Sequence, residues 1–161
     1  MKIEKLNHNG FGICYIDGKV TFVKNTLIGD EVEISIIKEH KTYNEAKVTK
    51  YITKSPLHTS PVCPYADKCG GCAYQIMSYE EELSQKQKVV EEILGKKSQI
   101  IKCDDYNYRN KITLKVKDGK IGFFEEGTHN LVSIEKCYLC TEKINKIIKE
   151  LLTIDLSNSY E

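Results

Sequence analysis

The sequence is organised around a cysteine-rich stretch, CPYADKCGGC, which occupies residues 63–72. Three of the seven cysteines in the 161-residue chain fall within it, and a glycine pair separates the last two. Thiolates are soft ligands that select iron–sulfur clusters or zinc, and glycine allows sharp turns and close backbone approach to a cluster. Because three thiols from one loop cannot complete a tetrahedral or four-iron site, a fourth ligand must come from elsewhere.

The best candidate for the fourth ligand is Cys137, and we interpret the site as a [4Fe–4S] cluster that ties this later segment to the loop. Zinc is the alternative, because Cys69-x-x-Cys72 and Cys137-x-x-Cys140 have the paired spacing of a four-cysteine zinc site. That arrangement has an unusually long spacer and leaves Cys63 without a role. Spacing therefore favours the cluster and leaves the choice between Cys137 and Cys140 open.

The composition is that of an ordinary folded protein. Charged residues make up 29% of the chain and apolar residues 40%, which argues against disorder. No apolar run is long enough to cross a bilayer, and residues 1–5 do not begin a secretory signal. We therefore expect a cytoplasmic monomer without a membrane partner, whose cysteines serve a metal site. With a net charge of +1, any surface for nucleic acid must be local.

The N-terminal part, residues 1–54, predicts a small β domain. Asn-Gly at 9–10 and Asp-Gly at 17–18 are strong hairpin signals, and residues 31–38 alternate apolar and polar side chains. About five short strands in this length indicate a closed barrel of the OB type, a fold that often binds oligonucleotides. Residues 55–62, with two prolines, predict a linker.

The remaining part, residues 63–161, predicts an α+β domain built around the metal site, so the whole chain is expected to be mainly β. We expect a helix over 78–94, a sheet over 106–134 and a C-terminal helix over 141–152. Each helix has apolar residues at helical spacing and is expected to bury one face. These residues are Tyr79, Leu83, Val90 and Leu94 in the first helix, and Ile144, Ile147, Ile148, Leu151 and Leu152 in the second.

Cationic and aromatic side chains are interleaved in the predicted sheet. Cations hold phosphates and aromatic rings stack on unpaired bases, so this is the best local RNA-binding surface in the chain. An ordinary sheet with a charged outer face would show the same pattern and is the alternative interpretation. The cations are Arg109, Lys111, Lys115, Lys117 and Lys120, and the rings are Tyr106, Tyr108, Phe123 and Phe124.

The cysteine stretch and its neighbours resemble the signature of the bacterial RNA uracil-C5 methyltransferases, which make 5-methyluridine in 23S ribosomal RNA. The preceding residues resemble the N-terminal TRAM domain of these enzymes, and later blocks resemble their central domain. The matching segments are residues 6–12 and 17–20 for the TRAM domain, residues 63–72 with Gln75, Tyr79, Leu83 and Lys86 for the signature, and residues 108–111, 122–123 and Cys137 for the central domain.

The resemblance implies functional roles for individual residues. It assigns a [4Fe–4S] cluster of structural purpose to four cysteines, and it adds His129 to the residues expected to face RNA. S-adenosylmethionine would bind only in the family's separate catalytic domain, which the sequence does not show. We therefore expect the N-terminal part of such an enzyme, inactive without that domain and with no catalytic residue of its own. The implied cluster ligands are Cys63, Cys69, Cys72 and Cys137.

Two other functions fit the same sequence. The chain could be a free-standing RNA-binding module that acts without methylation, which predicts tight RNA binding with no partner. It could also be a zinc-stabilised structural domain, which predicts bound zinc and no effect on RNA.

Overall fold

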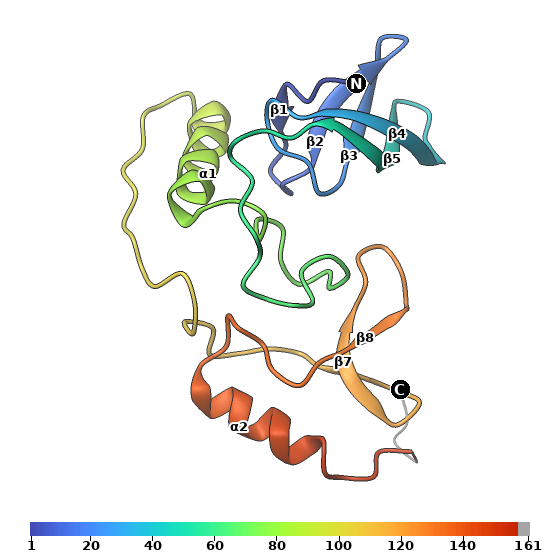
Figure 1. Cartoon of the computed structure of the whole chain (residues 1–161). Coiled ribbons are helices and arrows are strands. Elements are labelled where there is room, and N and C mark those ends of the chain that lie inside the picture. The colour runs from blue at the N-terminus through green and yellow to red at the C-terminus, as the bar shows by residue number, and fades with distance from the viewer. Residues whose placement is uncertain (158–161) are drawn as a thin grey trace. The chain divides into compact units, whose positions relative to one another are not determined.

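The computed structural model describes residues 1–157, which form two compact units (Figure 1). The first unit comprises Met1–Ser60 and Ala73–Ile100, and the second comprises Pro61–Cys72 and the chain from Ile101 onward. The cysteine stretch therefore lies in the second unit, while the helix that follows it lies in the first. This division differs from the predicted one, in which all residues after 62 form one domain.

The first unit contains a five-stranded sheet in the order β1-β2-β3-β5-β4. Neighbouring strands are antiparallel except β3 and β5, which pair in parallel. Both predicted hairpins are confirmed. Residues 7–11 join the antiparallel strands β1 and β2, and the turn at 17–18 joins β2 to β3. The strands are β1 (Lys5–Leu6), β2 (Gly12–Ile16), β3 (Lys19–Val23), β4 (Glu31–Glu39) and β5 (Tyr43–Thr53).

The sheet does not form the closed barrel that the sequence predicted. β1 and β4 lie at opposite ends of the strand order, and an isolated bridge between Lys2 and Glu31 links the N-terminal residues to β4. β1 pairs with β2 through two residues, whereas β4 and β5 pair along their length with several register shifts. Alternation of apolar side chains still builds a core, formed by Ile3, Cys14, Val23, Val32 and Ala46.

A buried carboxylate fastens the sheet to the segment that follows β5. Asp30 is fully buried, and its oxygens accept hydrogen bonds from Leu27 N at 2.7 Å, Ser55 N at 2.7 Å and His58 Nε2 at 2.8 Å. A buried charge is tolerated when it is paired and hydrogen-bonded in this way. The start of the predicted linker is therefore an ordered part of the first unit.

The helix α1 (Tyr79–Leu94) confirms the predicted helix but not its buried face. Ser78 Oγ accepts a hydrogen bond from Glu81 N at 3.2 Å, and Gly95 ends the helix in the left-handed conformation. Val90 and Leu94 remain 42% and 62% exposed, and the buried residue of this helix is Gln85. The expected apolar face is thus open at its C-terminal end, whereas Tyr79 and Leu83 are half-buried.

The second unit contains a small antiparallel sheet in the order β6-β7-β8, with α2 (Glu142–Leu151). The strands are β6 (Lys115–Lys117), β7 (Lys120–Phe124) and β8 (Leu131–Ser133). The Asp-Gly turn at 118–119 has positive φ at both residues, as the sequence predicted. The predicted sheet over 106–134 is too long, since residues 106–114 form only isolated pairing.

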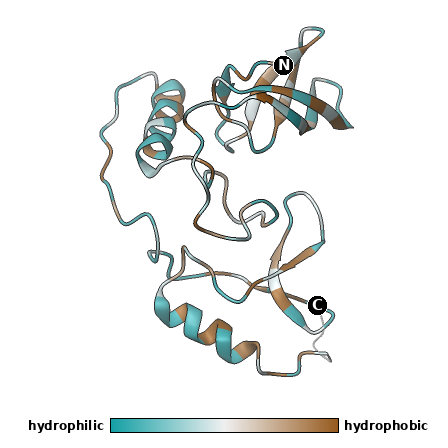
Figure 2. Cartoon of the chain, in the orientation of Figure 1, coloured by the Kyte–Doolittle hydropathy of each residue, from teal (hydrophilic) through white to brown (hydrophobic). Residues whose placement is uncertain are grey.

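The core of the second unit lies between its sheet and α2. Ile121, Ile134 and Ile148 are buried there, and Ile144 and Leu151 pack against them. Figure 2 shows hydrophobic and hydrophilic bands alternating along α2, as expected of an amphipathic helix. The predicted apolar stripe is confirmed in part, because Ile147 remains 53% exposed. In the described part of the chain, neither helix has the length and apolar character needed to cross a membrane.

Replacement of Asp30 by alanine tests the buried carboxylate. Asp30→Ala leaves buried donors without an acceptor, so we expect the free energy of unfolding to fall by about 3–5 kcal/mol. Urea unfolding followed by circular dichroism measures the change. The control, Glu39→Ala, removes an exposed carboxylate 4.0 Å from Lys19 and should cost at most about 0.5 kcal/mol. Equal losses for the two variants would contradict the role of Asp30.

Candidate functional site

The cysteine stretch is fixed to the end of β7 by backbone pairing. Cys69 forms an antiparallel bridge with Glu125, and Gly70 N donates a hydrogen bond to Phe124 O at 3.0 Å. Within the stretch, Cys69 N donates to Tyr65 O at 2.8 Å, which closes a tight turn. The Tyr65 ring packs on the core of the second unit. The three thiols of the stretch are thereby held against the small sheet.

Gly70 is required by this close approach. A Cβ atom at Gly70 would lie 2.8 Å from Glu126 N and 2.9 Å from Phe124 O, distances that real Cβ atoms do not show. At Gly71 the nearest atom to such a Cβ would be Cys69 Sγ, at 3.4 Å. The first glycine of the pair therefore serves packing against the strand, and the second has more space.

The segment with Cys137 and Cys140 is fixed by a buried amide. Asn145, on the first turns of α2, is 7% exposed, and its Oδ1 accepts a hydrogen bond from Cys137 N at 2.9 Å. Its Nδ2 donates to Cys137 O at 3.1 Å and to Cys140 O at 3.2 Å. Arg109 lies beside this segment. Its backbone N donates a hydrogen bond to Leu139 O at 2.7 Å, and Arg109 forms a parallel bridge with Cys140.

Five thiols of the second unit lie within electrostatic reach of one another, and they include all four predicted ligands. Burial raises the pKa of four of them, to about 11 for Cys72 and about 12 for Cys140. The neighbouring Cys137 raises the pKa of each further, while Arg109 lowers that of three. The five are Cys63, Cys69, Cys72, Cys137 and Cys140.

These raised pKa values have a consequence for ligand binding. Thiols bind metals as thiolates, so a metal that enters this site must displace protons from the cysteines. Within residues 1–157, no three cysteine, histidine or acidic side chains converge closely enough to hold a single metal ion. Cys140 forms a side-chain hydrogen bond with Cys137, so the two candidates for the fourth ligand lie side by side, and the choice between them stays a prediction.

A cluster of cationic and aromatic side chains, which we call the hairpin face, lies on β6, β7 and the turn after β7. Lys115 Nζ lies 5.7 Å from the centre of the Phe124 ring, and that ring lies 5.3 Å from the His129 ring. Lys117 Nζ donates a hydrogen bond to His129 O at 3.1 Å. The structure thus brings together Lys115, Lys117 and His129, three of the residues predicted to bind RNA.

The other residues predicted to bind RNA lie elsewhere in the second unit. Phe123 and Phe124 are both half-buried; Phe123 packs against the core, whereas Phe124 lies beside Lys115 and His129, so the contact of Phe123 with RNA stays a prediction. Arg109 lies with the cysteines, and Lys111 is exposed in the irregular segment before β6. Strand alternation could have found Phe124, because residues two apart share a face and Ile121 is a core residue.

Comparison with known proteins relates the N-terminal residues to a domain family and nearly the whole chain to RNA methyltransferases. Residues 1–49 match the TRAM domain family. The chain is 34% identical over 160 residues to an uncharacterized RNA methyltransferase of Aquifex aeolicus, covering 94% of this chain and 38% of that protein. It is 29% identical over 168 residues to the 23S rRNA (uracil(1939)-C(5))-methyltransferase RlmD of Shewanella amazonensis, with 96% and 38% covered. The chain is homologous to the N-terminal part of the RNA uracil-C5 methyltransferases.

A solved structure supports this relationship to the uracil-C5 methyltransferases. The crystal structure of the Pyrococcus abyssi tRNA (uracil-54, C5)-methyltransferase in complex with S-adenosyl-L-homocysteine matches with a TM-score of 0.71 and 26% identity. The match covers 93% of this chain and 35% of that protein. The chain therefore spans little more than a third of the length of the methyltransferases it matches.

Substitution of the glycine pair tests how the cysteine stretch is attached. Gly70→Ala forces the stretch away from β7, so we expect the free energy of unfolding to fall by about 1–3 kcal/mol. Gly71→Ala has the space for its methyl group and should change stability less. Chemical unfolding of both variants measures the difference. If Gly71→Ala were the more damaging change, the attachment through Gly70 would be wrong.

Proposed function

We propose that this chain recognises RNA and presents a uridine for C5 methylation by S-adenosylmethionine. The TRAM match and the methyltransferase relatives support an RNA substrate. We assign 23S ribosomal RNA as the target, after the Shewanella relative, with transfer RNA, the substrate named for the Pyrococcus enzyme, as the alternative. We assign no catalytic residue to this chain and place the cofactor and the methyl-transfer chemistry in the remainder of such an enzyme.

The observation that carries the proposal is the link between the cysteine stretch and the hairpin face. Gly70 N is bonded to the carbonyl of Phe124, the residue whose ring lies between Lys115 and His129. Cations neutralise phosphates and aromatic rings stack on unpaired bases, so this face suits single-stranded RNA. A group that fixed the position of the cysteine stretch would therefore also fix the position of the hairpin face, which would contact RNA.

We further propose that Cys63, Cys69, Cys72 and Cys137 hold a [4Fe–4S] cluster. The donor set fits, because cysteine thiolates are the usual ligands of such clusters. The cluster would join the two segments that carry the thiols and would neutralise thiolates that burial otherwise disfavours. Methyl transfer requires no electron, so a structural purpose suffices. Cysteines without disulfides and a cluster suit a reducing cytoplasm, where we expect the protein to act as a monomer.

Serine substitutions distinguish the ligands of this cluster. Cys137→Ser removes a ligand and should abolish most bound iron, whereas Cys140→Ser should retain it. Iron and acid-labile sulfide per chain, measured on anaerobically purified protein with its visible absorption spectrum, give the result. About four of each in the wild type fits the proposal. One zinc per chain with no sulfide would contradict the cluster and support the four-cysteine zinc site. Loss of iron in Cys140→Ser alone would identify Cys140, and not Cys137, as the fourth ligand.

Neutralisation of one lysine tests the hairpin face. Lys115→Gln removes one phosphate contact, so affinity for a single-stranded RNA should fall about five-fold at ~0.1 M salt. The slope of log affinity against log salt should become shallower by about 0.7. Fluorescence anisotropy with labelled RNA at several salt concentrations measures both. Lys102→Gln, an exposed lysine outside the face, is the control with the same charge change, and an identical slope in the two variants would exclude Lys115 from the interface.

A further inference from the structure

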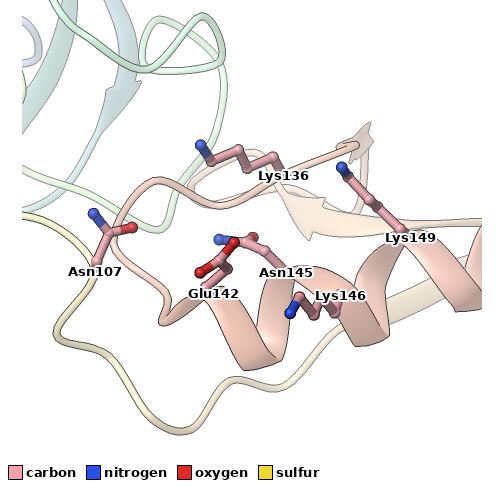
Figure 3. Close-up of a pocket in the computed structure, with 6 residues that line it drawn as sticks. All are labelled: Asn107, Lys136, Glu142, Asn145, Lys146 and Lys149. Atoms are coloured by element: carbon pink, nitrogen blue, oxygen red, sulfur yellow. The ribbon is translucent and has the colours of Figure 1, made fainter.

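A cavity of about 470 Å³ lies beside the first turns of α2, in the second unit (Figure 3). Its volume falls within the range of small-molecule sites, about 300–1,000 Å³. Four of its lining residues belong to α2, and the other two come from separate segments that face the helix. The lining residues are Asn107, Lys136, Glu142, Asn145, Lys146 and Lys149.

The lining of this cavity is cationic. Its lining includes three lysines and a single carboxylate, that of Glu142, and none of these four side chains forms an ion pair with another described residue. Lys136 Nζ lies 4.8 Å from the centre of the Tyr138 ring, a contact that holds the ammonium group without neutralising its charge. Like charges around one space repel each other, so an anion in the cavity would stabilise the arrangement.

The lysines of the cavity are exposed, whereas the backbone around the cavity is fixed by the fold. Lys146 and Lys149 are three residues apart and share one side of α2. Ile144 and Leu151, on the other side of the helix, pack against the core of the second unit. Asn145, in the cavity wall, is bonded to the backbone of the Cys137 segment, and Asn107 N donates to Tyr138 O at 3.1 Å in that same segment. Hydrogen bonds to the Cys137 segment therefore fix the positions of Asn107 and Asn145 in the cavity lining.

We propose that this cavity is a phosphate-binding site and that its occupant is a backbone phosphate of RNA. Lysine ammonium groups bind phosphate as point charges, and the polar lining does not suit an apolar ligand. The choice of RNA as the source of the phosphate rests on the proposed function. The site is separate from the hairpin face but belongs to the same unit. One cysteine segment is attached to each: the stretch at 63–72 through the hydrogen bond from Gly70 to Phe124 of β7, and the Cys137 segment through Asn145 of α2.

The proposal is tested on the full chain, purified anaerobically with its bound metal. The double variant Lys146→Gln with Lys149→Gln should weaken binding to labelled single-stranded RNA about five-fold per lost contact at ~0.1 M salt. Its salt slope should become shallower by about 0.7 per contact. Glu142→Gln removes the opposing charge and should tighten binding. The control is Lys143→Gln, an exposed lysine of α2 outside the cavity, which should match the wild type.

A second arm of the experiment uses tripolyphosphate, measured by calorimetry on the same variants. If the double variant binds RNA like Lys143→Gln while the wild type binds well, the cavity is not a phosphate site although the proposed function stands. If the wild type binds no RNA, the proposed function and the RNA occupant both fail. In that case, tripolyphosphate binding by the wild type that is lost in the double variant would still support a phosphate site. Failure of the wild type to bind either RNA or tripolyphosphate would overturn the phosphate site. An unchanged affinity in Glu142→Gln would also count against the cavity.

Discussion

The second unit depends on the backbone pairing between the cysteine stretch and the end of β7. The hydrogen bond from Gly70 N to Phe124 O exists because a glycine allows the two chains to approach closely. In the segment that contains Cys137 and Cys140, the Asn145 amide performs the equivalent task by forming hydrogen bonds with the backbone of both cysteines. Two segments about seventy residues apart in sequence are thereby brought to one place.

The environment of these cysteines favours their neutral form. Half-buried and buried thiols with raised pKa values lie near one another and near one guanidinium, that of Arg109, which only partly favours their charged form. A metal group that takes the thiolates would convert this cluster of poorly solvated thiols into a crosslink between the two segments. Because one segment is joined to the hairpin face and the other to the wall of the lysine-lined cavity, such a crosslink would order both cationic surfaces together.

The first unit is stabilised by an apolar core and a buried carboxylate instead of a cysteine segment. Its sheet is built from alternating side chains around a small apolar core, and the carboxylate of Asp30 connects it to Ser55 and His58. Both partners lie where the sequence suggested only a linker, because a proline-containing segment carries no local sign that a buried carboxylate elsewhere will bind it. The TRAM match over residues 1–49 agrees with the predicted β domain, although the strand pairing leaves the sheet open.

The sequence by itself determined the local elements, because turns, helix caps and alternation depend on residues close together in the chain. It identified the hairpin at 118–119, the cap at Ser78 and the cysteine stretch with its family resemblance. Only the tertiary structure decided which faces are covered, since burial depends on distant residues. It left Val90 exposed, turned Phe124 rather than Phe123 toward the cations, and assembled the lysine-lined cavity from three segments that no local pattern connects.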